Sequence, residues 1–246
     1  MMLMVDAGNT RIKWGLATAG VLSAPGACTY KGLALAETLG QVWSGLQTPE
    51  RILAANVAGA GLGGSLADFC RQRFGREVEF VQASAKSCGV TNAYAQPVQL
   101  GADRWAAIIG AHHIYKGPAC VISCGTAITI DGVTGDGRHL GGLIAAGLTA
   151  MQQALADAAP VLPREVGGNH TLFAQDTQTA VTSGLLYAAA GFIERTTGEM
   201  RARLGEDTKL LLTGGDIERL RPLLHGRFTL APHLVLEGLA LLAEQV

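Results

Sequence analysis

Hydrophobic and polar positions alternate at the start of the chain with the period of two that is typical of a half-buried β-strand. Residues 3–5 are apolar, and Ile12, Trp14 and Leu16 alternate with polar or small neighbours. The segment between them, residues 6–10, is polar and contains a glycine. The pattern predicts a strand, a tight turn and a second strand. P-loop and Rossmann sites need a helix directly after their glycines, so the pattern argues against both.

The same arrangement returns in the second half of the chain. Residues 119–123 are apolar, a Cys-Gly-Thr segment at 124–126 interrupts them, and alternation resumes at Ile128. Two strand–turn–strand segments of the same kind predict a chain that is built of two related halves. We place these halves at residues 1–115 and 116–246.

Further strands and helices are predicted in both halves, so the fold class is α/β. Segments with apolar residues at helical spacing alternate with short apolar runs that turn residues bound. The predicted helices span residues 34–47, 62–74, 105–113, 148–157, 179–204 and 234–244. The remaining predicted strands span residues 51–57, 78–81, 140–146 and 209–213. Glycines bracket the strand at 140–146, which we expect to be an inner strand of its sheet.

Glycine is unusually frequent, at 33 of the 246 residues, which is about twice its ordinary share. Most of these glycines lie in apolar segments rather than in Ser-rich linkers. Isolated glycines in strand-like runs indicate sharp turns or the close approach of a ligand. Gly214 and Gly215 follow a predicted strand and suit the approach of a flat ring such as adenine, although an ordinary turn has the same pattern.

Charge and cysteine content exclude several classes of function. The net charge is −1, which argues against a protein that binds nucleic acid through a basic field. No apolar run reaches the roughly 18 residues of a membrane span, and the first residues lack the basic segment of a signal peptide. The five cysteines include no C-x-x-C pair, which argues against a disulfide framework and a zinc site. These features predict a cytoplasmic protein.

The first turn carries residue types that are suited to binding phosphate. Its N–H groups and the Thr10 hydroxyl can face phosphate oxygens, Asp6 can face a phosphate-bound Mg²⁺ directly or through water, and Lys13 follows within reach. An ordinary β-hairpin would carry a similar turn. The second turn, with Gly125 and Thr126, favours a nucleotide site, because two such turns can clamp one phosphate chain.

The segment from Gly101 to Arg104 pairs a carboxylate with a guanidinium just before a predicted helix. Asp103 can accept the proton of an attacking hydroxyl, and Arg104 can bind a carboxylate or a transferring phosphoryl group. A helix-capping residue with an adjacent surface ion pair is the alternative interpretation of the same residues. His112 and His113 point in different directions on a helix, which argues against a shared metal ion.

Five motifs occur in the order and spacing of the type III pantothenate kinases, and the chain resembles this family over nearly its whole length. They are Asp6-x-Gly8-Asn9-Thr10-x-x-Lys13, Gly101-Ala102-Asp103-Arg104, Gly125-Thr126-Ala127-x-Thr129, Gly141-Gly142-x-Ile144-x-x-Gly147 and Thr213-Gly214-Gly215. The resemblance implies the acetate and sugar kinase, Hsp70 and actin superfamily, whose fold is a duplicated ribonuclease H-like (actin-like ATPase) domain with ATP between the halves. It also implies ATP-dependent phosphorylation of pantothenate to 4'-phosphopantothenate, the first step of coenzyme A biosynthesis.

The resemblance also implies roles for individual residues. Those implied to bind the ATP phosphates belong to the two turns and are Asp6, Ala7, Gly8, Asn9, Thr10, Arg11, Ile12, Lys13, Gly125 and Thr126. Asp6 is implied to hold Mg²⁺ through phosphate or water, and Asp103 to be the catalytic base. Those implied to bind pantothenate are Tyr94, Gly101, Ala102, Asp103, Arg104 and Thr177.

Two positions depart from the pattern of the family. Many members carry Asp three residues before the second Thr, where it ligates an activating K⁺ or ammonium ion, and this chain has Ser123 there. A hydroxyl brings no charge, so the need for a monovalent cation stays open. Asp176 stands where Asn is common, next to the intact Thr177.

Two other functions stay open as alternatives. Some relatives are known as Bvg accessory factors, which implies a transcriptional regulator, although the near-neutral charge argues against direct binding to duplex DNA. Superfamily membership alone also allows a kinase of a sugar or of acetate, because a fold does not determine a function. Family members are homodimers, so we expect a homodimer in which the helix at 179–204 takes part.

Overall fold

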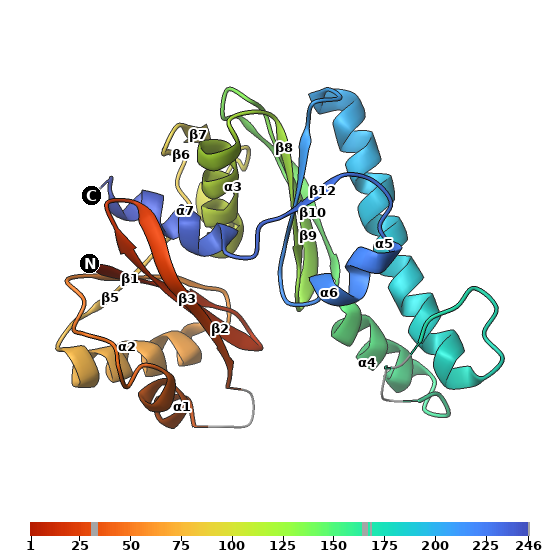
Figure 1. Cartoon of the computed structure of the whole chain (residues 1–246), viewed down its shortest axis with the longest axis horizontal. Helices are drawn as coiled ribbons and strands as arrows, with labels where there is room; N and C mark the ends of the chain where they lie inside the picture. The colour runs from red at the N-terminus through yellow and green to blue at the C-terminus, as the bar shows by residue number, and fades with distance from the viewer. Residues whose placement is uncertain (31–33, 164–166, 168, 246) are drawn as a thin grey trace. The chain divides into compact units, whose positions relative to one another are not determined.

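The computed structural model describes residues 1–30, 34–163, 167 and 169–245. The chain forms two compact units (Figure 1). The first comprises Met1–Lys116, Asp136–His139 and His233–Val246, and the second comprises Gly117–Gly135 and Leu140–Pro232. The first segment of the first unit ends at Lys116, next to the division that was expected after residue 115. The units differ from the expected halves at the end of the chain, because the closing segment lies in the first unit.

The first unit is built on a five-stranded sheet with the strand order β3-β2-β1-β4-β5. Its strands are β1 (Met2–Ala7), β2 (Arg11–Thr18), β3 (Val21–Thr29), β4 (Ile52–Asn56) and β5 (Val78–Phe80). The first three strands form an antiparallel meander, while β4 and β5 run parallel to β1. The predicted strand–turn–strand start is confirmed, whereas β3 was not predicted.

Helices cover both faces of this sheet (Figure 1). They are α1 (Leu35–Val42), α2 (Ala60–Phe74), α3 (Ala102–Tyr115) and α7 (Leu234–Ala243). Leu3 and Val5 of β1 form a buried core with Trp43 and Leu66 on the face that α1 and α2 cover. Because alternate residues of a strand point to opposite faces, Asp6 lies on the face where α3 and α7 pack.

The close packing of α7 on α3 explains why the end of the chain joins the first unit. A Cβ at Gly238 would collide with the carbonyl of Ala106, and one at Gly110 would lie 2.7 Å from the carbonyl oxygen of Leu234. Backbones that approach this closely require glycine at the contact. The unit also contains the small hairpin of β6 (Lys86–Ser87) and β7 (Val90–Thr91), and the 3₁₀ turn η1 (Pro97–Gln99).

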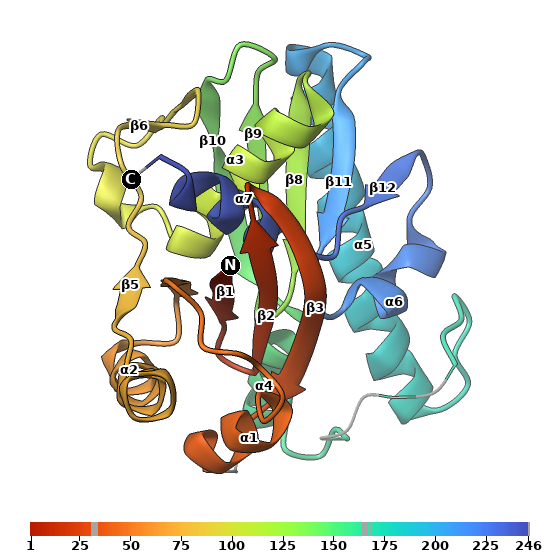
Figure 2. The same cartoon turned by 60° about the vertical axis from the view of Figure 1, so that its left-hand side comes forward.

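The second unit repeats the topology of the first, with the strand order β10-β9-β8-β11-β12 (Figure 2). Its strands are β8 (Ala119–Cys124), β9 (Ala127–Val133), β10 (His139–Ala146), β11 (Lys209–Thr213) and β12 (Phe228–Leu230). Its helices are α4 (Leu148–Ala158), α5 (Thr177–Leu204), α6 (Ile217–Leu220) and the 3₁₀ turn η2 (Arg221–Leu223). The predicted duplication is confirmed. The prediction of an inner strand at 140–146 is wrong, because β10 lies at the edge of its sheet.

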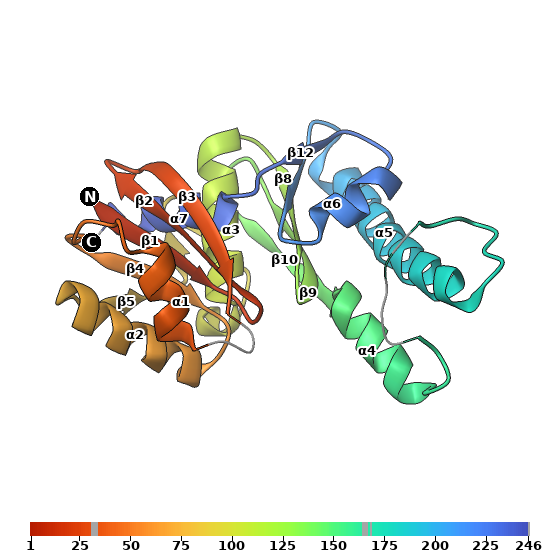
Figure 3. The ribbon, with the colours of Figure 1, turned by 60° about the horizontal axis from the view of Figure 1, so that its bottom comes forward.

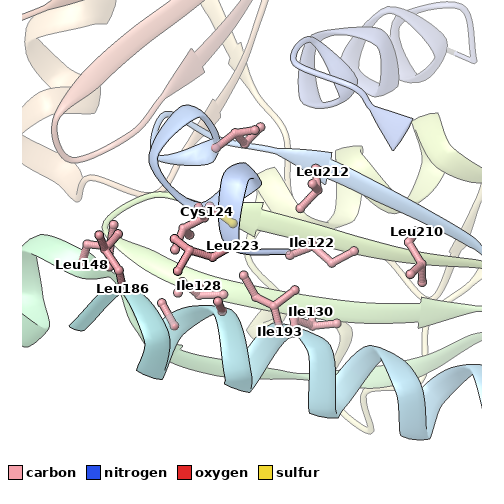
Figure 4. Close-up of a cluster of buried hydrophobic side chains, with 14 of the residues drawn as sticks. Ile122, Cys124, Ile128, Ile130, Leu148, Leu186, Ile193, Leu210, Leu212 and Leu223 are labelled. Carbon is pink, nitrogen blue, oxygen red and sulfur yellow. The ribbon is translucent and has the colours of Figure 1, made fainter. Parts of the chain in front are cut away.

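The core of the second unit lies where α5 packs against the sheet (Figures 3 and 4). Ile122 of β8 and Ile130 of β9 are buried there with Leu186 and Ile193 of α5. Alternate strand residues, Ser123 among them, therefore point to the other face of the sheet. In the part of the chain that the structure describes, no helix is both long enough and apolar enough to cross a membrane.

Candidate functional site

The turn between β1 and β2 is held by hydrogen bonds on two sides. The N–H of Gly8 donates to the carbonyl of Arg11 over 3.1 Å, and the Tyr30 hydroxyl donates to the carbonyl of Gly8 over 2.8 Å. Asp6 of β1 pairs directly with Lys13 of β2, so the two side chains lie on the same face of the sheet. The residues of the first turn that are expected to bind phosphate thus lie at one end of a hairpin. Tyr30 supports this end without belonging to any motif in the sequence.

Asp6 occupies an environment that disfavours its charge. Burial raises the pKa of its carboxyl from 3.8 to about 6, while the Lys13 ammonium opposes this rise and the Asp103 carboxylate adds to it. A divalent cation relieves repulsion between carboxylates, and oxygen ligands are those that Mg²⁺ prefers. The environment of Asp6 therefore fits Mg²⁺.

Asp103 lies in the first turn of α3. The capping residue is Gly101, and the Asp103 carboxylate accepts the N–H of Arg104 over 2.8 Å, so the interpretation of Asp103 as the cap is wrong. A Cβ on Gly101 would lie 2.7 Å from Oδ1 of Asp103, so glycine at this position leaves room for the carboxylate. A carboxylate in a first helical turn is favoured as its anion by ~0.3–1 kcal/mol, which suits a proton acceptor. Ala102 is the first residue of the helix.

Tyr94 and Arg104 contact each other next to Asp103 in the first unit. The buried Arg104 side chain donates from Nη1 to the Tyr94 hydroxyl over 3.1 Å. The Asn92 side chain accepts the N–H of Tyr94 over 3.0 Å, and the His139 ring stacks on the Tyr94 ring with the centroids 6.1 Å apart. Sequence reasoning found Tyr94 and Arg104. It missed Asn92, which binds the N–H of Tyr94 within a short turn, and His139, which packs on Tyr94 from a distant segment of the chain.

The turn between β8 and β9 is enclosed by glycines of other segments. Gly147 donates its N–H to the carbonyl of Thr126 over 3.0 Å, and a Cβ on Gly147 would collide with the carbonyl of Gly125. Gly214 has φ +108°, and a Cβ there would collide with the backbone of Cys124. Both glycines are therefore required by the packing of this turn, which is the second of the two expected phosphate turns.

Ser123 lies in a row of three hydroxyl residues in the second sheet. It pairs with Thr129 of β9 on one side and with Thr213 of β11 on the other. Among the described residues, the buried Thr213 hydroxyl oxygen has no hydrogen-bond partner. This row offers hydroxyl oxygens and no carboxylate. It therefore does not fit the monovalent cation site that the resemblance implies, in which an Asp ligates the ion.

Thr177 is the first residue of α5, and its side chain is exposed. Asp176 caps the helix by accepting the N–H of Thr179 over 2.8 Å. Asn and Asp are about equally good in this capping role, so Asp176 in place of Asn leaves the start of the helix intact.

Comparison with known proteins identifies the family. The sequence model of the family described as type III pantothenate kinase matches residues 2–199 of the chain. The chain belongs to the type III pantothenate kinase family. The type III pantothenate kinase of Nitrosococcus oceani is 35% identical over 99% of this chain and 94% of its own length. That of Azoarcus sp. is 40% identical over 99% of this chain and 90% of its own length.

A solved structure supports the fold of this member of the type III pantothenate kinase family. The activator of the 2-hydroxyisocaproyl-CoA dehydratase from Clostridium difficile, with bound ADPNP, has a TM-score of 0.55 and 11% identity. The match covers 99% of this chain and 94% of that one. Together with the two sheets of equal topology, it confirms the duplicated ribonuclease H-like α/β fold.

Proposed function

We propose that this chain transfers the γ-phosphoryl group of ATP to pantothenate in the cytoplasm and so forms 4'-phosphopantothenate, the first step of coenzyme A biosynthesis. The observation that carries the proposal is that Asp103, in the first turn of α3 and next to Arg104, lies within electrostatic reach of Asp6. Phosphoryl transfer to a hydroxyl requires a proton acceptor close to an anchor for metal and phosphate. Asp103 and Asp6 of the first unit suit these two roles, and membership of the family supports pantothenate as the acceptor.

The ATP phosphates bind the turn between β1 and β2 in this proposal, which contributes Asp6, Ala7, Gly8, Asn9, Thr10, Arg11, Ile12 and Lys13. Within the second unit, Gly125 and Thr126 of the turn between β8 and β9 are proposed as nucleotide-binding residues. Backbone N–H groups of such turns and the Lys13 ammonium favour negatively charged oxygens. Tyr30 acts indirectly, because its hydrogen bond to Gly8 holds the first turn in one conformation.

Mg²⁺ is the metal of this proposal, held by Asp6 directly or through water. Bound there, it would supply charge neutralisation to the phosphates. The cation would also lower the pKa of Asp6 and keep its carboxylate ionised at neutral pH. A monovalent cation is left out of the proposal, because the row of Ser123, Thr129 and Thr213 offers no charge.

Asp103 is the general base of the proposed reaction. Its carboxylate takes the proton of the pantothenate hydroxyl while that oxygen bonds to the γ-phosphorus, and the bond from the γ-phosphorus to the departing ADP oxygen breaks. Arg104 and Tyr94 bind pantothenate beside the base, and their mutual hydrogen bond restricts both side chains. In the second unit, Thr177 at the start of α5 is proposed as a substrate-binding residue.

We extend the proposal to a homodimer that pairs through α5. Gly184, Gly191 and Gly198 recur at every seventh position of this helix, and all three are exposed together with Tyr187 and Ala188. A Cβ on any of these glycines would meet nothing within 4 Å, so packing within the chain does not explain them. Small residues at a seven-residue repeat suit close contact with a second helix. Light scattering should give a dimer that Gly191→Arg dissociates, and a monomeric parent protein would contradict the pairing.

The experiment that tests the proposed activity is an ADP-release assay with a panel of acceptors. We expect ADP to form with pantothenate and not with a hexose or acetate, and the product to gain the mass of one phosphate. Preference for another acceptor would contradict the substrate. Absence of ADP with every acceptor, combined with a gel shift of promoter DNA at physiological salt, would favour the regulatory alternative.

A further inference from the structure

We propose that His139 is a positioning residue for the acceptor substrate, acting through Tyr94. The inference rests on the proposed function and extends it, since His139 belongs to none of the motifs and lies at the start of β10. Its side chain is buried, with 3% of its surface exposed. Buried polar groups in proteins are normally held by specific partners, and the partners of His139 indicate its role.

Two contacts tie His139 to Tyr94 and its neighbour. The imidazole ring stacks on the Tyr94 ring at an interplanar angle of 18°, with the centroids 6.1 Å apart. The backbone N–H of Ala93 donates to Nδ1 of His139 over 3.5 Å, a long hydrogen bond that orients the ring. Histidine thus supplies both a flat face and an acceptor, a combination that neither a purely apolar ring nor an aliphatic side chain offers.

Backbone contacts of the segment that carries His139 keep its ring in place against Tyr94. The N–H of Thr91 donates to the carbonyl of Gly137 over 2.8 Å, and Thr91 bridges Arg138 in a parallel arrangement. Gly137 has φ +83°, and a Cβ there would collide with the carbonyl of Gly89. The segment Asp136–His139 is therefore fixed along the loop that carries Tyr94.

The contacts continue from Tyr94 to the proposed base. The Tyr94 hydroxyl accepts from Nη1 of Arg104 over 3.1 Å, and the Arg104 N–H donates to the Asp103 carboxylate over 2.8 Å. Tyr94 has two rotatable side-chain bonds, and stacking on a buried ring restricts both. Loss of the stack would free the Tyr94 hydroxyl to leave Arg104, which would weaken the binding of pantothenate more than that of ATP.

A set of variants separates the two contacts of His139. His139→Ala removes both, His139→Phe keeps the flat ring, and His139→Asn keeps a short acceptor. Arg138→Ala is the matched control, because its side chain is exposed in the same segment. For each variant, kcat and the two KM values are measured, pantothenate binding is followed by calorimetry, and circular dichroism verifies the fold.

We expect His139→Ala to raise the KM for pantothenate by roughly 2- to 12-fold, the equivalent of one aromatic pair, with the KM for ATP unchanged. His139→Phe should recover most of this loss. Adding His139→Ala to Tyr94→Leu should cause little further loss, since His139 acts through Tyr94.

An unchanged pantothenate KM in His139→Ala, or in His139→Asn should the alanine variant not fold, would overturn the inference. An equal rise in both KM values would overturn it as well, because it would indicate a general structural role. A parent enzyme that neither binds nor phosphorylates pantothenate would instead overturn the proposed function, which makes the two failures distinguishable.

Discussion

Asp6 of β1 lies directly opposite Lys13 of β2, and burial nevertheless raises the pKa of the Asp6 carboxyl to about 6. The ammonium of Lys13 offsets only part of the effect of burial, and the carboxylate of Asp103 acts in the opposite direction. The folded protein therefore keeps a carboxylate whose charged form is disfavoured. Binding and catalytic groups often carry such a perturbed pKa, and here a divalent cation is the natural partner.

Replacing Asp6 by the neutral Asn should stabilise the protein in the absence of ligand at high pH. Because the pKa of Asp6 is higher in the folded state, the folded chain binds more protons than the unfolded chain between pH 3.8 and about 6. The free energy of unfolding therefore falls as pH rises through this window. Above pH 6, a rise in the pKa of Asp6 from 3.8 to about 6 lowers the free energy of unfolding by roughly 3 kcal/mol.

Urea unfolding of Asp6→Asn and of the parent protein at pH 8 and at pH 4 measures this effect. We expect the variant to be more stable by about 1–3 kcal/mol at pH 8 and by much less at pH 4. With Mg²⁺ and ATP present at pH 8 the order should reverse, since the variant loses the ligand-binding carboxylate. Equal differences at both pH values would show that the charge of Asp6 is not the cause.

Gly101→Ala should reduce activity without unfolding the protein. The new Cβ would lie 2.7 Å from Oδ1 of Asp103, and the carboxylate is the group that can move. A misplacement of about 1 Å can lower a rate by ~10²-fold, so steady-state kinetics should show a large fall in kcat. Gly64→Ala in α2 is the control, because its Cβ would meet nothing within 4 Å and its activity should not change. An equally large fall in kcat in Gly64→Ala would contradict the explanation that Gly101→Ala acts by displacing the Asp103 carboxylate.

The enzyme should be active without K⁺ or ammonium. Ser123, Thr129 and Thr213 offer hydroxyl oxygens only, and a hard cation is held more strongly where a carboxylate supplies charge. The rate should be the same in potassium and in tetramethylammonium buffers. Ser123→Asp should make the rate rise with K⁺ concentration. A parent enzyme that is inactive until K⁺ is added would refute this prediction.

The sequence pattern predicted most regular elements and failed where tertiary packing decides. Both strand–turn–strand segments follow from alternation of apolar and polar residues. β3 was missed because Pro25 and Gly26 within it are typical of turns, and at a sheet edge they are tolerated. Gly184 and Gly191 lower the helix propensity of this segment, yet α5 runs through both positions because its packing on the second sheet stabilises the helix.

The part of the candidate site that belongs to short sequence motifs could be predicted from the sequence. Asp6, Lys13, Asp103 and Arg104 belong to short motifs whose residue types indicate phosphate and proton chemistry. The contact of His139 with Tyr94 joins segments far apart in the sequence, and only the folded chain reveals it. The position of α7 on α3 likewise depends on a close approach of two backbones, which the pattern of apolar and polar residues does not encode.

The most direct test of the account is the turnover of Asp103→Asn. Asn keeps the size of the side chain and removes the proton acceptor, so kcat with pantothenate should fall by about 10²–10⁴-fold. Calorimetric titration with a non-hydrolysable ATP analogue and Mg²⁺ should give the same affinity as for the parent enzyme. Turnover close to that of the parent enzyme, with an intact fold, would contradict the assignment of Asp103 as the base.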